Sequence, residues 1–409
     1  MNEYMKETNE ALLHTYNQFP VVLERGEGAY LYDTEGKKYL DFAAGYAVSS
    51  LGYADKELND ALKEQIDKIF HTSNLYYNTA CGKAAEDLKR ITGMDRIFFT
   101  NSGGEAVEGT LKAARKYAYK KGTGRYEFIA MKESFHGRSF GAVSVKGHDA
   151  YREPFEPLVP GVSFAQYNDL DSVKALVTDK TCAIILEPLQ GEGGFIPAPI
   201  EFVKKLRKIC DDNGIMLIAD EVQCGNCRTG KYFTSEYWEE AGAAPDIIAT
   251  AKSMGAGVPI SAISAREEVM DAAPAGTIGG TYCGNPLACA AAIKTMEIMK
   301  EEDYCAKSIH IGSVVRKAFE KMKEKYDIIG DVRGIGGMLG IEFVKDKERK
   351  EPNPEFVSKL VQTALQKGLL LENAGSFGNV IRFLAPLCMT EEQMETGLKI
   401  FEESILANL

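Results

Sequence analysis

The segment Pro199–Asp220, with the sequence PIEFVKKLRKICDDNGIMLIAD, decides the class of fold expected for this chain. Its first part is an amphipathic helical pattern, whose apolar stripe consists of Phe202, Val203, Leu206, Ile209 and Cys210. Gly214 ends this helix, because glycine readily adopts the left-handed conformation that closes a helix. The run Ile215–Asp220 then follows without polar alternation, as expected of a strand covered on both faces. A helix that leads directly into such a strand indicates an α/β protein with a mainly parallel sheet.

Other short apolar runs extend this pattern on both sides. Five further strands are expected at Arg96–Thr100, Glu127–Met131, Ala183–Glu187, Asp246–Thr250 and Ile260–Ser264. Because helical segments separate these strands, we expect a large domain with a mainly parallel central sheet over residues 53–305.

The two ends of the chain have a different pattern. A hairpin is expected over residues 25–42, with Glu35-Gly36 in its turn. After residue 305 we expect a helix, a glycine-rich strand over Gly334–Phe343, a helix near residues 354–367, the apolar run Asn379–Pro386 and a last helix from about residue 391. These segments predict a smaller α+β domain built from residues 1–52 and 306–409.

Charge and cysteine content argue against several classes of protein. The 409 residues include 48 Lys and Arg against 59 Asp and Glu, a net charge of −11, so neither a nucleic acid nor an anionic membrane is expected as a partner. The longest uncharged stretch, Ala272–Ile293, contains prolines and glycines, which predicts a loop leading into a helix at about Pro286 rather than a membrane span. Nine scattered cysteines and a polar N-terminus predict a cytoplasmic protein without a secretory signal.

Three familiar motifs are nearly matched but incomplete. Gly225–Tyr232 has the spacing of a phosphate-binding P-loop, but it ends in tyrosine where a Ser or Thr hydroxyl would bind Mg²⁺. Gly334–Leu339 lacks the third glycine of a dinucleotide-binding fingerprint. Cys224 and Cys227 have the spacing of zinc ligands, but no second Cys or His pair follows, so no metal is expected.

Three expected strand ends carry residues suited to chemistry. Ser102-Gly103-Gly104-Glu105 follows a strand and opens a helix, whose free N–H groups either bind a phosphate or are simply capped. Asp220 and Glu221 end a buried strand. Because a carboxylate removed from water needs a cation or hydrogen-bond donors, they either face a protonated ring nitrogen of a ligand or form a structural contact. Lys252 ends another strand, so it either reacts with an aldehyde or reaches solvent. Ligands of open α/β sheets bind at this edge, so the three ends together indicate a site.

Several longer motifs together resemble the class III aminotransferases, from about residue 20 to the C-terminus. They are Phe135-His-Gly-Arg138, Glu187-Pro-Leu-Gln-Gly-Glu192, Asp220-Glu-Val-Gln223, Thr250-Ala-Lys252 and Gly279-Gly-Thr281-Tyr-Cys-Gly-Asn-Pro. The resemblance implies the aspartate aminotransferase-like fold, which is fold type I of the enzymes that use pyridoxal 5′-phosphate, and it implies that cofactor. It also implies a ping-pong reaction between a small-molecule amino donor and a 2-oxo acid acceptor, through the pyridoxamine form of the cofactor.

The resemblance also implies roles for individual residues. Lys252 would bond to the cofactor aldehyde and move a proton, and Asp220 would keep the ring nitrogen protonated. Phe135 and Val222 would stack on the two ring faces. Thr281 of the partner subunit would join the phosphate site, which implies a homodimer. The full set of implied cofactor-binding residues is Ser102, Gly103, Gly104, Phe135, His136, Glu187, Asp220, Val222, Gln223, Lys252 and Thr281.

Substrate choice is implied to depend on three charged residues. Arg138 resembles the arginine that binds the carboxylate distal to the reacting amine, and Arg382 resembles the arginine that clamps an α-carboxylate. Glu192 resembles a switch that pairs with Arg382 when an ω-amine is bound and turns away for glutamate. Further implied substrate contacts are Tyr46, Tyr77 and Gly280.

Within the family, Leu40–Val48 and His71–Tyr77 are most similar to acetylornithine aminotransferases, so N-acetylornithine and 2-oxoglutarate are the expected substrates. Tyr46 is similar to ornithine aminotransferases, and Gly280-Thr281 to 4-aminobutyrate aminotransferases, so these donors are the alternatives. An aminomutase, racemase or decarboxylase using the same cofactor is a further hypothesis. A binding protein without cofactor is the last one, and a colourless purified protein would favour it.

Overall fold

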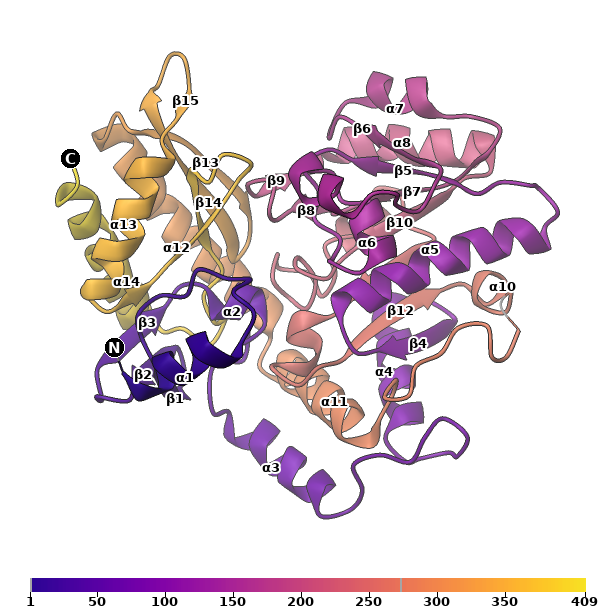
Figure 1. Cartoon of the computed structure of the whole chain (residues 1–409), viewed down its shortest axis with the longest axis horizontal. Helices are drawn as coiled ribbons and strands as arrows, with labels where there is room; N and C mark the ends of the chain where they lie inside the picture. Colours follow the sequence, from indigo (N-terminus) through magenta and orange to yellow (C-terminus); the bar gives the residue numbers. More distant parts are fainter. Residues whose placement is uncertain (1, 273) are drawn as a thin grey trace.

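The computed structural model describes residues 2–272 and 274–409. Over these residues, the largest sheet has seven strands in the spatial order β4-β12-β11-β10-β7-β5-β6 (Figure 1). Their bounds are Arg96–Thr100 for β4, Glu127–Met131 for β5, Val162–Ala165 for β6, Thr181–Leu186 for β7, Met216–Asp220 for β10, Ile247–Thr250 for β11 and Ser261–Ala265 for β12. Only β12 runs antiparallel to its neighbours in this described sheet. The prediction of a mainly parallel sheet is confirmed, although the half-exposed edge strand β6 was not expected.

Helices cover both faces of this sheet. Ile184 on β7 shares a hydrophobic cluster with α8 (Ile200–Asn213), whereas the next residue, Ile185, shares one with α5 (Gly103–Lys120). Because successive strand residues point to opposite faces, apolar residues are needed at both positions. Gly214 ends α8 in the left-handed conformation, at φ +62°, as expected.

Two further sheets come from the ends of the chain. One has the order β1-β2-β3-β16, and the other β13-β14-β18-β17 with β15 beside β14. Their bounds are Leu23–Glu27 for β1, Tyr30–Asp33 for β2, Lys38–Asp41 for β3, Ile329–Ile335 for β13, Met338–Asp346 for β14, Glu351–Pro352 for β15, Leu369–Leu370 for β16, Glu372–Ala374 for β17 and Val380–Phe383 for β18. Strand β16 pairs in parallel with β3, so both ends of the chain contribute to one sheet. The division at residues 53 and 305 stays a prediction.

Helices α12 (Tyr304–Lys325), α13 (Pro354–Gln366) and α14 (Glu391–Leu406) share one hydrophobic cluster with β14 and β18. The other helices are α1 Glu3–Ala11, α2 Ala44–Ala47, α3 Lys56–Ile66, α4 Cys81–Thr92, α6 Phe140–Ser144, α7 Leu170–Leu176, α9 Glu236–Glu240, α10 Glu267–Met270 and α11 Pro286–Glu301. Short 3₁₀ helices span Asp149–Tyr151, Glu153–Phe155 and Lys252–Gly255, and a ribbon pairs β8 Leu189–Gln190 with β9 Ile196–Pro197.

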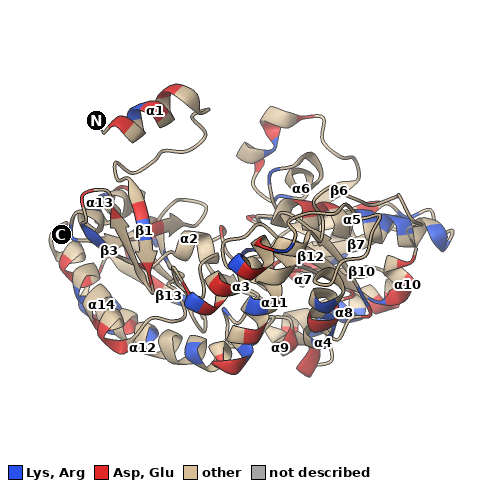
Figure 2. Cartoon of the chain, turned by 90° about the horizontal axis from the view of Figure 1, so that it is seen from below, with Lys and Arg blue, Asp and Glu red and all other residues tan. Residues whose placement is uncertain are grey.

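Acidic and basic residues are interspersed along outer helices such as α3 and α12 (Figure 2). In the same view, α1 stands away from the sheets at the N-terminal end of the chain. None of the helices in the described part of the chain combines the length and the apolar character that crossing a bilayer requires.

Local expectations were met in some places and not in others. The hairpin expected over residues 25–42 is made by β1, β2 and β3, with Glu35-Gly36 in the turn between β2 and β3. The single strand expected over Gly334–Phe343 is wrong, because Gly336 turns the chain at φ +54° between β13 and β14. A Cβ there would lie 2.7 Å from the backbone of Thr229, so glycine is required. Helix α11 begins at Pro286 as expected, while position 273 of the loop before it lies outside the described residues.

Candidate active site

The residues singled out by their chemistry gather at one edge of the seven-stranded sheet. Asp220 is the last residue of β10, and Lys252 lies two residues beyond β11. Ser102 follows β4, Phe135-His136 follows β5, and Glu187 follows β7. Since β4, β5, β7, β10 and β11 run in the same direction, all these positions lie at the carboxyl edge of the sheet.

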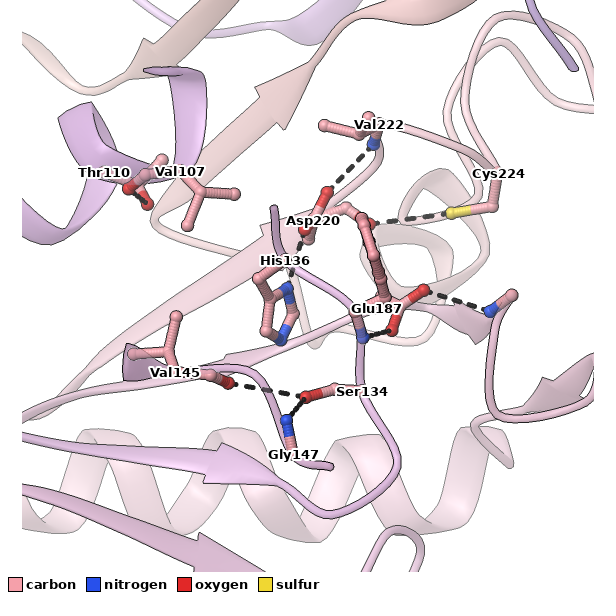
Figure 3. A network of polar contacts seen from close by, with 12 residues as sticks. Val107, Thr110, Ser134, His136, Val145, Gly147, Glu187, Asp220, Val222 and Cys224 are labelled. Atoms are coloured by element: carbon pink, nitrogen blue, oxygen red, sulfur yellow. Dashed lines mark hydrogen bonds and ion pairs between the residues drawn. The ribbon is translucent and has the colours of Figure 1, made fainter. Parts of the chain in front are cut away.

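A buried carboxylate–imidazole pair lies at this edge (Figure 3). Asp220 is 3% exposed, and its Oδ2 lies 2.7 Å from Nδ1 of His136. Its Oδ1 accepts a hydrogen bond of 3.0 Å from the backbone N–H of Val222. Because Nδ1 of His136 faces a carboxylate, it is the donor, and Nε2 is left buried without a hydrogen-bond partner among the described residues. The pair holds a negative charge in a fixed orientation where the strand ends.

Glu187 ties the ends of β5 and β7 together. Its Oε1 accepts a hydrogen bond of 2.9 Å from the N–H of Phe135, and its Oε2 accepts one of 3.0 Å from the N–H of Gly191. Burial raises the pKa of Glu187 to about 7. Both oxygens are engaged by the backbone, so Glu187 holds the Phe135 segment in place (Figure 3).

Helix α5 opens beside Asp220 with two free N–H groups. Ser102 caps this helix through its Oγ, which accepts a hydrogen bond of 3.3 Å from the N–H of Glu105. The first-turn N–H groups of Gly103 and Gly104 have no acceptor within the described residues. A Cβ at Gly103 would lie 2.7 Å from Cγ1 of Val222, so glycine lets the helix begin this close to the end of β10. This arrangement suits an anion such as phosphate.

Lys252 is a partly buried amine without a counter-ion. It adopts a left-handed backbone at φ +50°, a strained conformation that recurs at functional sites. Its Nζ makes no hydrogen bond or ion pair with any residue that the structure describes. Burial lowers the pKa of Lys252 to about 8, although Glu192 opposes this shift. A larger neutral fraction suits an amine that attacks a carbonyl carbon and carries a proton.

Arg382 and Glu192 form a two-armed ion pair. Arg382 is 2% exposed, and its Nη1 and Nη2 lie 2.9 and 3.1 Å from the two carboxylate oxygens of Glu192. The guanidinium also donates to the carbonyl oxygen of Asn373, at 3.0 Å from Nε and 2.6 Å from Nη2. Burial opposes the ionisation of Glu192, but the Arg382 charge outweighs it and keeps the pKa of Glu192 below its ordinary value. The ring centroid of Tyr46 lies 5.1 Å from Cζ of Arg382.

Glu372 is a site residue that no sequence motif indicated. It lies opposite Arg382 in the register of β17 and β18, and its Oε2 is buried without a hydrogen-bond partner among the described residues. Burial raises its pKa to about 7, although Arg382 opposes this shift. In the sequence, Glu372 is marked only by its place as an acidic residue directly after the apolar run Leu369–Leu371.

Arg138 lies nearer the surface than Asp220 and Arg382. Its side chain is exposed, and its Cζ lies 5.7 Å from the ring centroid of Phe135 and 5.5 Å from that of Tyr151. The side chain of Gln223 packs directly on Gly191. A Cβ added to Gly191 would lie 1.7 Å from Oε1 of Gln223.

Tyr77, Gly280 and Thr281 lie in two neighbouring surface loops. Tyr77 is fully exposed, and Thr281 is exposed as well. The carbonyl of Gly280 accepts a hydrogen bond of 2.8 Å from Nδ2 of Asn74, which holds the loops side by side. In the described part of the chain, no hydrogen bond or ion pair connects Tyr77 or Thr281 to Asp220.

The groups gathered at this edge of the sheet fit pyridoxal 5′-phosphate, the cofactor expected from the sequence. The N–H groups of Gly103 and Gly104 suit its phosphate, and Asp220 suits a protonated ring nitrogen. Lys252 suits its aldehyde. Nδ1 of His136 holds Asp220 in its orientation, while the buried Nε2 of the same ring has no hydrogen-bond partner among the described residues.

Glu221 and Cys224 have a local structural function instead. Oε1 of Glu221 accepts a hydrogen bond of 2.5 Å from the N–H of Ser235, and its Oε2 accepts bonds of 3.1 Å from the N–H of Thr234 and from Sγ of Cys224. Cys224 and Cys227 are buried free thiols. Among the described residues, no three His, Cys, Asp or Glu side chains are grouped so that they could hold a metal ion. The absence of a metal stays a prediction.

Known proteins match nearly the whole chain. The model of the family described as aminotransferase class-III matches residues 12–405. The acetylornithine aminotransferase of Clostridium acetobutylicum is 42% identical over 398 residues, which cover 96% of this chain and 98% of that protein. The acetylornithine aminotransferase of Archaeoglobus fulgidus is also 42% identical, over 97% of this chain and 99% of that protein.

Solved structures are similar over nearly the whole chain. An ornithine aminotransferase from Toxoplasma gondii has a TM-score of 0.91 at 31% identity, covering 99% of this chain and 94% of that one. An acetylornithine aminotransferase from Elizabethkingia anophelis has a TM-score of 0.86 at 31% identity, covering 99% and 98%.

Proposed function

The chain belongs to the class-III aminotransferases, which use pyridoxal 5′-phosphate, and from this premise we propose that it transfers the ω-amino group of N-acetylornithine to 2-oxoglutarate. Its resemblance to curated acetylornithine aminotransferases over nearly their whole length supports this choice of donor.

The observation that carries the proposal is the ion pair of Arg382 with Glu192. Glutamate has an α-carboxylate beside its amino group, whereas the ω-amino end of N-acetylornithine has only a carbon chain there. A free Arg382 can clamp the α-carboxylate through two parallel hydrogen bonds. An Arg382 neutralised by Glu192 presents no unpaired buried charge to the carbon chain. One movable carboxylate therefore lets a single site accept both substrates.

The proposed roles of the other residues follow from their chemistry. When bound, the cofactor supplies an aldehyde carbon for the amine and a ring that spreads negative charge. With the cofactor bound, Nζ of Lys252 would take the proton from the substrate carbon that carries the amino group and deliver it to the former aldehyde carbon of the cofactor. Asp220, oriented by Nδ1 of His136, keeps a proton on the ring nitrogen through its negative charge. The N–H groups of Gly103 and Gly104 hold the phosphate.

Phe135, Val222 and Gln223 are proposed to surround the cofactor ring, and Arg138 to bind the distal carboxylate of both substrates. The position of Phe135 is supported by Glu187, which bonds its N–H. The position of Val222 is supported by its bond to Asp220. Tyr77 and Gly280 are proposed as outer substrate contacts.

Ornithine is the second candidate donor, and Tyr46 favours it. The centroid of its ring lies 5.1 Å from Cζ of Arg382, which places the ring beside the ion pair of the proposed site. The hydroxyl of Tyr46 can accept a hydrogen bond from the free α-ammonium of ornithine, which N-acetylornithine replaces with an amide.

We also propose a homodimer, in which Thr281 of the partner subunit completes the phosphate site. Large apolar side chains are exposed on α3, on the segment after it and on the loop that contains Thr281: Ile66, Ile69, Phe70, Leu75, Tyr76, Tyr77 and Tyr282. The ring centroids of His71 and Tyr282 are 5.3 Å apart, so the two exposed segments adjoin. Such a surface is typical of an interface, and a second copy is the commonest partner. Sedimentation equilibrium should give twice the mass of the chain, and a monomer would contradict the proposal.

The proposed location is the cytoplasm, supported by nine cysteines that are all free thiols. The proposed division into a domain of residues 53–305 and a second of residues 1–52 and 306–409 is supported by the seven-stranded sheet, which lies within the first range.

The proposed function is tested with purified holoenzyme and 2-oxoglutarate. Glutamate formation is measured with N-acetylornithine, ornithine and 4-aminobutyrate as donors, and N-acetylornithine should have the highest kcat/KM. A higher value for another donor would show that the substrate is wrong. Racemised or decarboxylated product without glutamate would show that the reaction class is wrong.

A further inference from the structure

A buried lysine next to the proposed site has no counter-ion. Lys146, two residues beyond α6, is 1% exposed, and its Nζ makes no hydrogen bond with any described residue. Its backbone is held in place, because Oγ of Ser134 donates to the carbonyl of Val145 at 3.4 Å and accepts from the N–H of Gly147 at 3.1 Å (Figure 3). Since Ser134 directly precedes Phe135, the backbones at Lys146 and Phe135 are held close together.

Two aromatic rings enclose the amine of Lys146. Its Nζ lies 3.3 Å from the ring centroid of Tyr151 and 4.1 Å from that of Phe135. The guanidinium of Arg138 lies against the same two rings, at 5.5 and 5.7 Å. Aromatic faces attract cations, and more strongly away from water. The rings therefore hold two cations close together, and neither has an ion pair among the described residues.

The acidic groups near Lys146 are already engaged. Burial, and after it the charge of Arg138, lower the pKa of Lys146 to about 8, although Glu192 and Glu187 oppose the shift. However, Glu187 accepts two backbone hydrogen bonds, and Glu192 is bonded to Arg382. This pair of cations therefore lacks an anion, which a bound substrate would supply.

We propose that Lys146 is the second cation of the distal subsite, where it acts with Arg138 to select substrates whose far end is an anion and to reject diamines, whose far end is a cation. The inference rests on the proposed function, because it names the class of substrate that the same site accepts. Lys146 is buried, so its field is weakly screened and acts on a carboxylate bound at Arg138. The same field repels the second ammonium group of putrescine.

The test compares the Lys146→Met holoenzyme with wild type and with Lys132→Met, a matched change of an exposed lysine directly after β5. The rate of the donor half-reaction is measured with N-acetylornithine, 4-aminobutyrate and putrescine in the absence of acceptor. The affinity for glutarate, a dicarboxylate that cannot react, is measured by calorimetry. In Lys146→Met, we expect about a tenfold loss with both carboxylate donors and with glutarate, and no loss with putrescine. Lys132→Met should match wild type.

Equal losses for putrescine and the carboxylate donors would overturn the proposal, as would unchanged glutarate binding. Lys146→Arg keeps the charge and should restore glutarate binding, and failure to do so would also overturn it. If Lys146→Met does not fold, Lys146→Gln carries the same expectations. If N-acetylornithine is a poor donor for the wild-type enzyme, the proposed donor is wrong. If 4-aminobutyrate and glutarate still distinguish Lys146→Met from wild type in that case, the role of Lys146 stands.

Discussion

Replacing Glu192 with glutamine should slow only one of the two half-reactions. The change keeps the size of the side chain but removes its charge from a pair whose arms measure 2.9 and 3.1 Å. Breaking a fully buried ion pair costs about 3–5 kcal/mol, which is an upper bound here because the side chain of Glu192 is 39% exposed. Arg382 keeps its hydrogen bonds to the carbonyl of Asn373 and lies opposite Glu372, so its charge is partly compensated. We therefore expect a smaller cost of about 2–3 kcal/mol, or about 30- to 150-fold in rate.

This decrease in rate should affect the ω-amine half-reaction. There the carbon chain of the donor faces an Arg382 that has lost its carboxylate, whereas glutamate brings its own carboxylate to the arginine. Arg382→Ala should have the reverse effect, because glutamate and 2-oxoglutarate lose their clamp.

The assay is stopped-flow absorbance of the cofactor in each half-reaction separately. Glu402→Gln is the control, because Glu402 pairs with Lys325 at 2.8 Å between α14 and α12, outside the strand ends that carry the proposed site, and this change should affect neither half-reaction. Equal slowing of both half-reactions by Glu192→Gln would refute the switch and show that Glu192 only maintains the local structure.

Three further predictions concern the proposed cofactor site. Lys252→Ala should lower turnover by about 10²–10⁴-fold, since it removes the group that moves the proton, while the cofactor still binds through its phosphate; near-normal turnover would contradict this role. Asp220→Asn loses a buried charge-assisted hydrogen bond worth about 1.5–3 kcal/mol, so both half-reactions should slow at least about tenfold, and unchanged single-turnover rates would assign the role to another group. Because the pKa of Lys252 is lowered to about 8, its neutral form grows as the pH rises, so covalent cofactor uptake by the apo-enzyme should accelerate through pH 8 and level off above about pH 9. A rate that still rises above pH 10 would indicate a lysine with an ordinary pKa.

Much of the large sheet could be predicted, because its strands are short apolar runs covered on both faces. Strand Glu127–Met131 matches its expected bounds, and the end of β10 at Asp220 was expected as well. Strand β6 was missed because it is a half-exposed edge strand without a clear apolar run. The turn at Gly336 was missed because glycines in an apolar run are compatible with both a strand and a hairpin, and here the backbone of Thr229 decides between them.

The candidate site could be predicted where its residues belong to short sequence motifs. Asp220, Lys252 and the Ser102–Gly104 junction each follow a recognisable strand, so their place at one edge of the sheet followed from the direction of the strands. Glu372 and Tyr151 belong to no such motif. Glu372 reaches Arg382 only through the pairing of β17 with β18, and Tyr151 reaches Lys146 only through packing.

The sequence by itself determined most strands of the large sheet and the chemical groups at their ends, because backbone preference and apolar periodicity depend on neighbours a few residues away. Only the tertiary structure decided which charges are paired. Glu192 and Arg382 are 190 positions apart, and Glu187 bonds a backbone N–H 52 positions away. Whether a charge such as Lys146 has a partner depends on distance through space and on the loss of water around it, and both are set by packing.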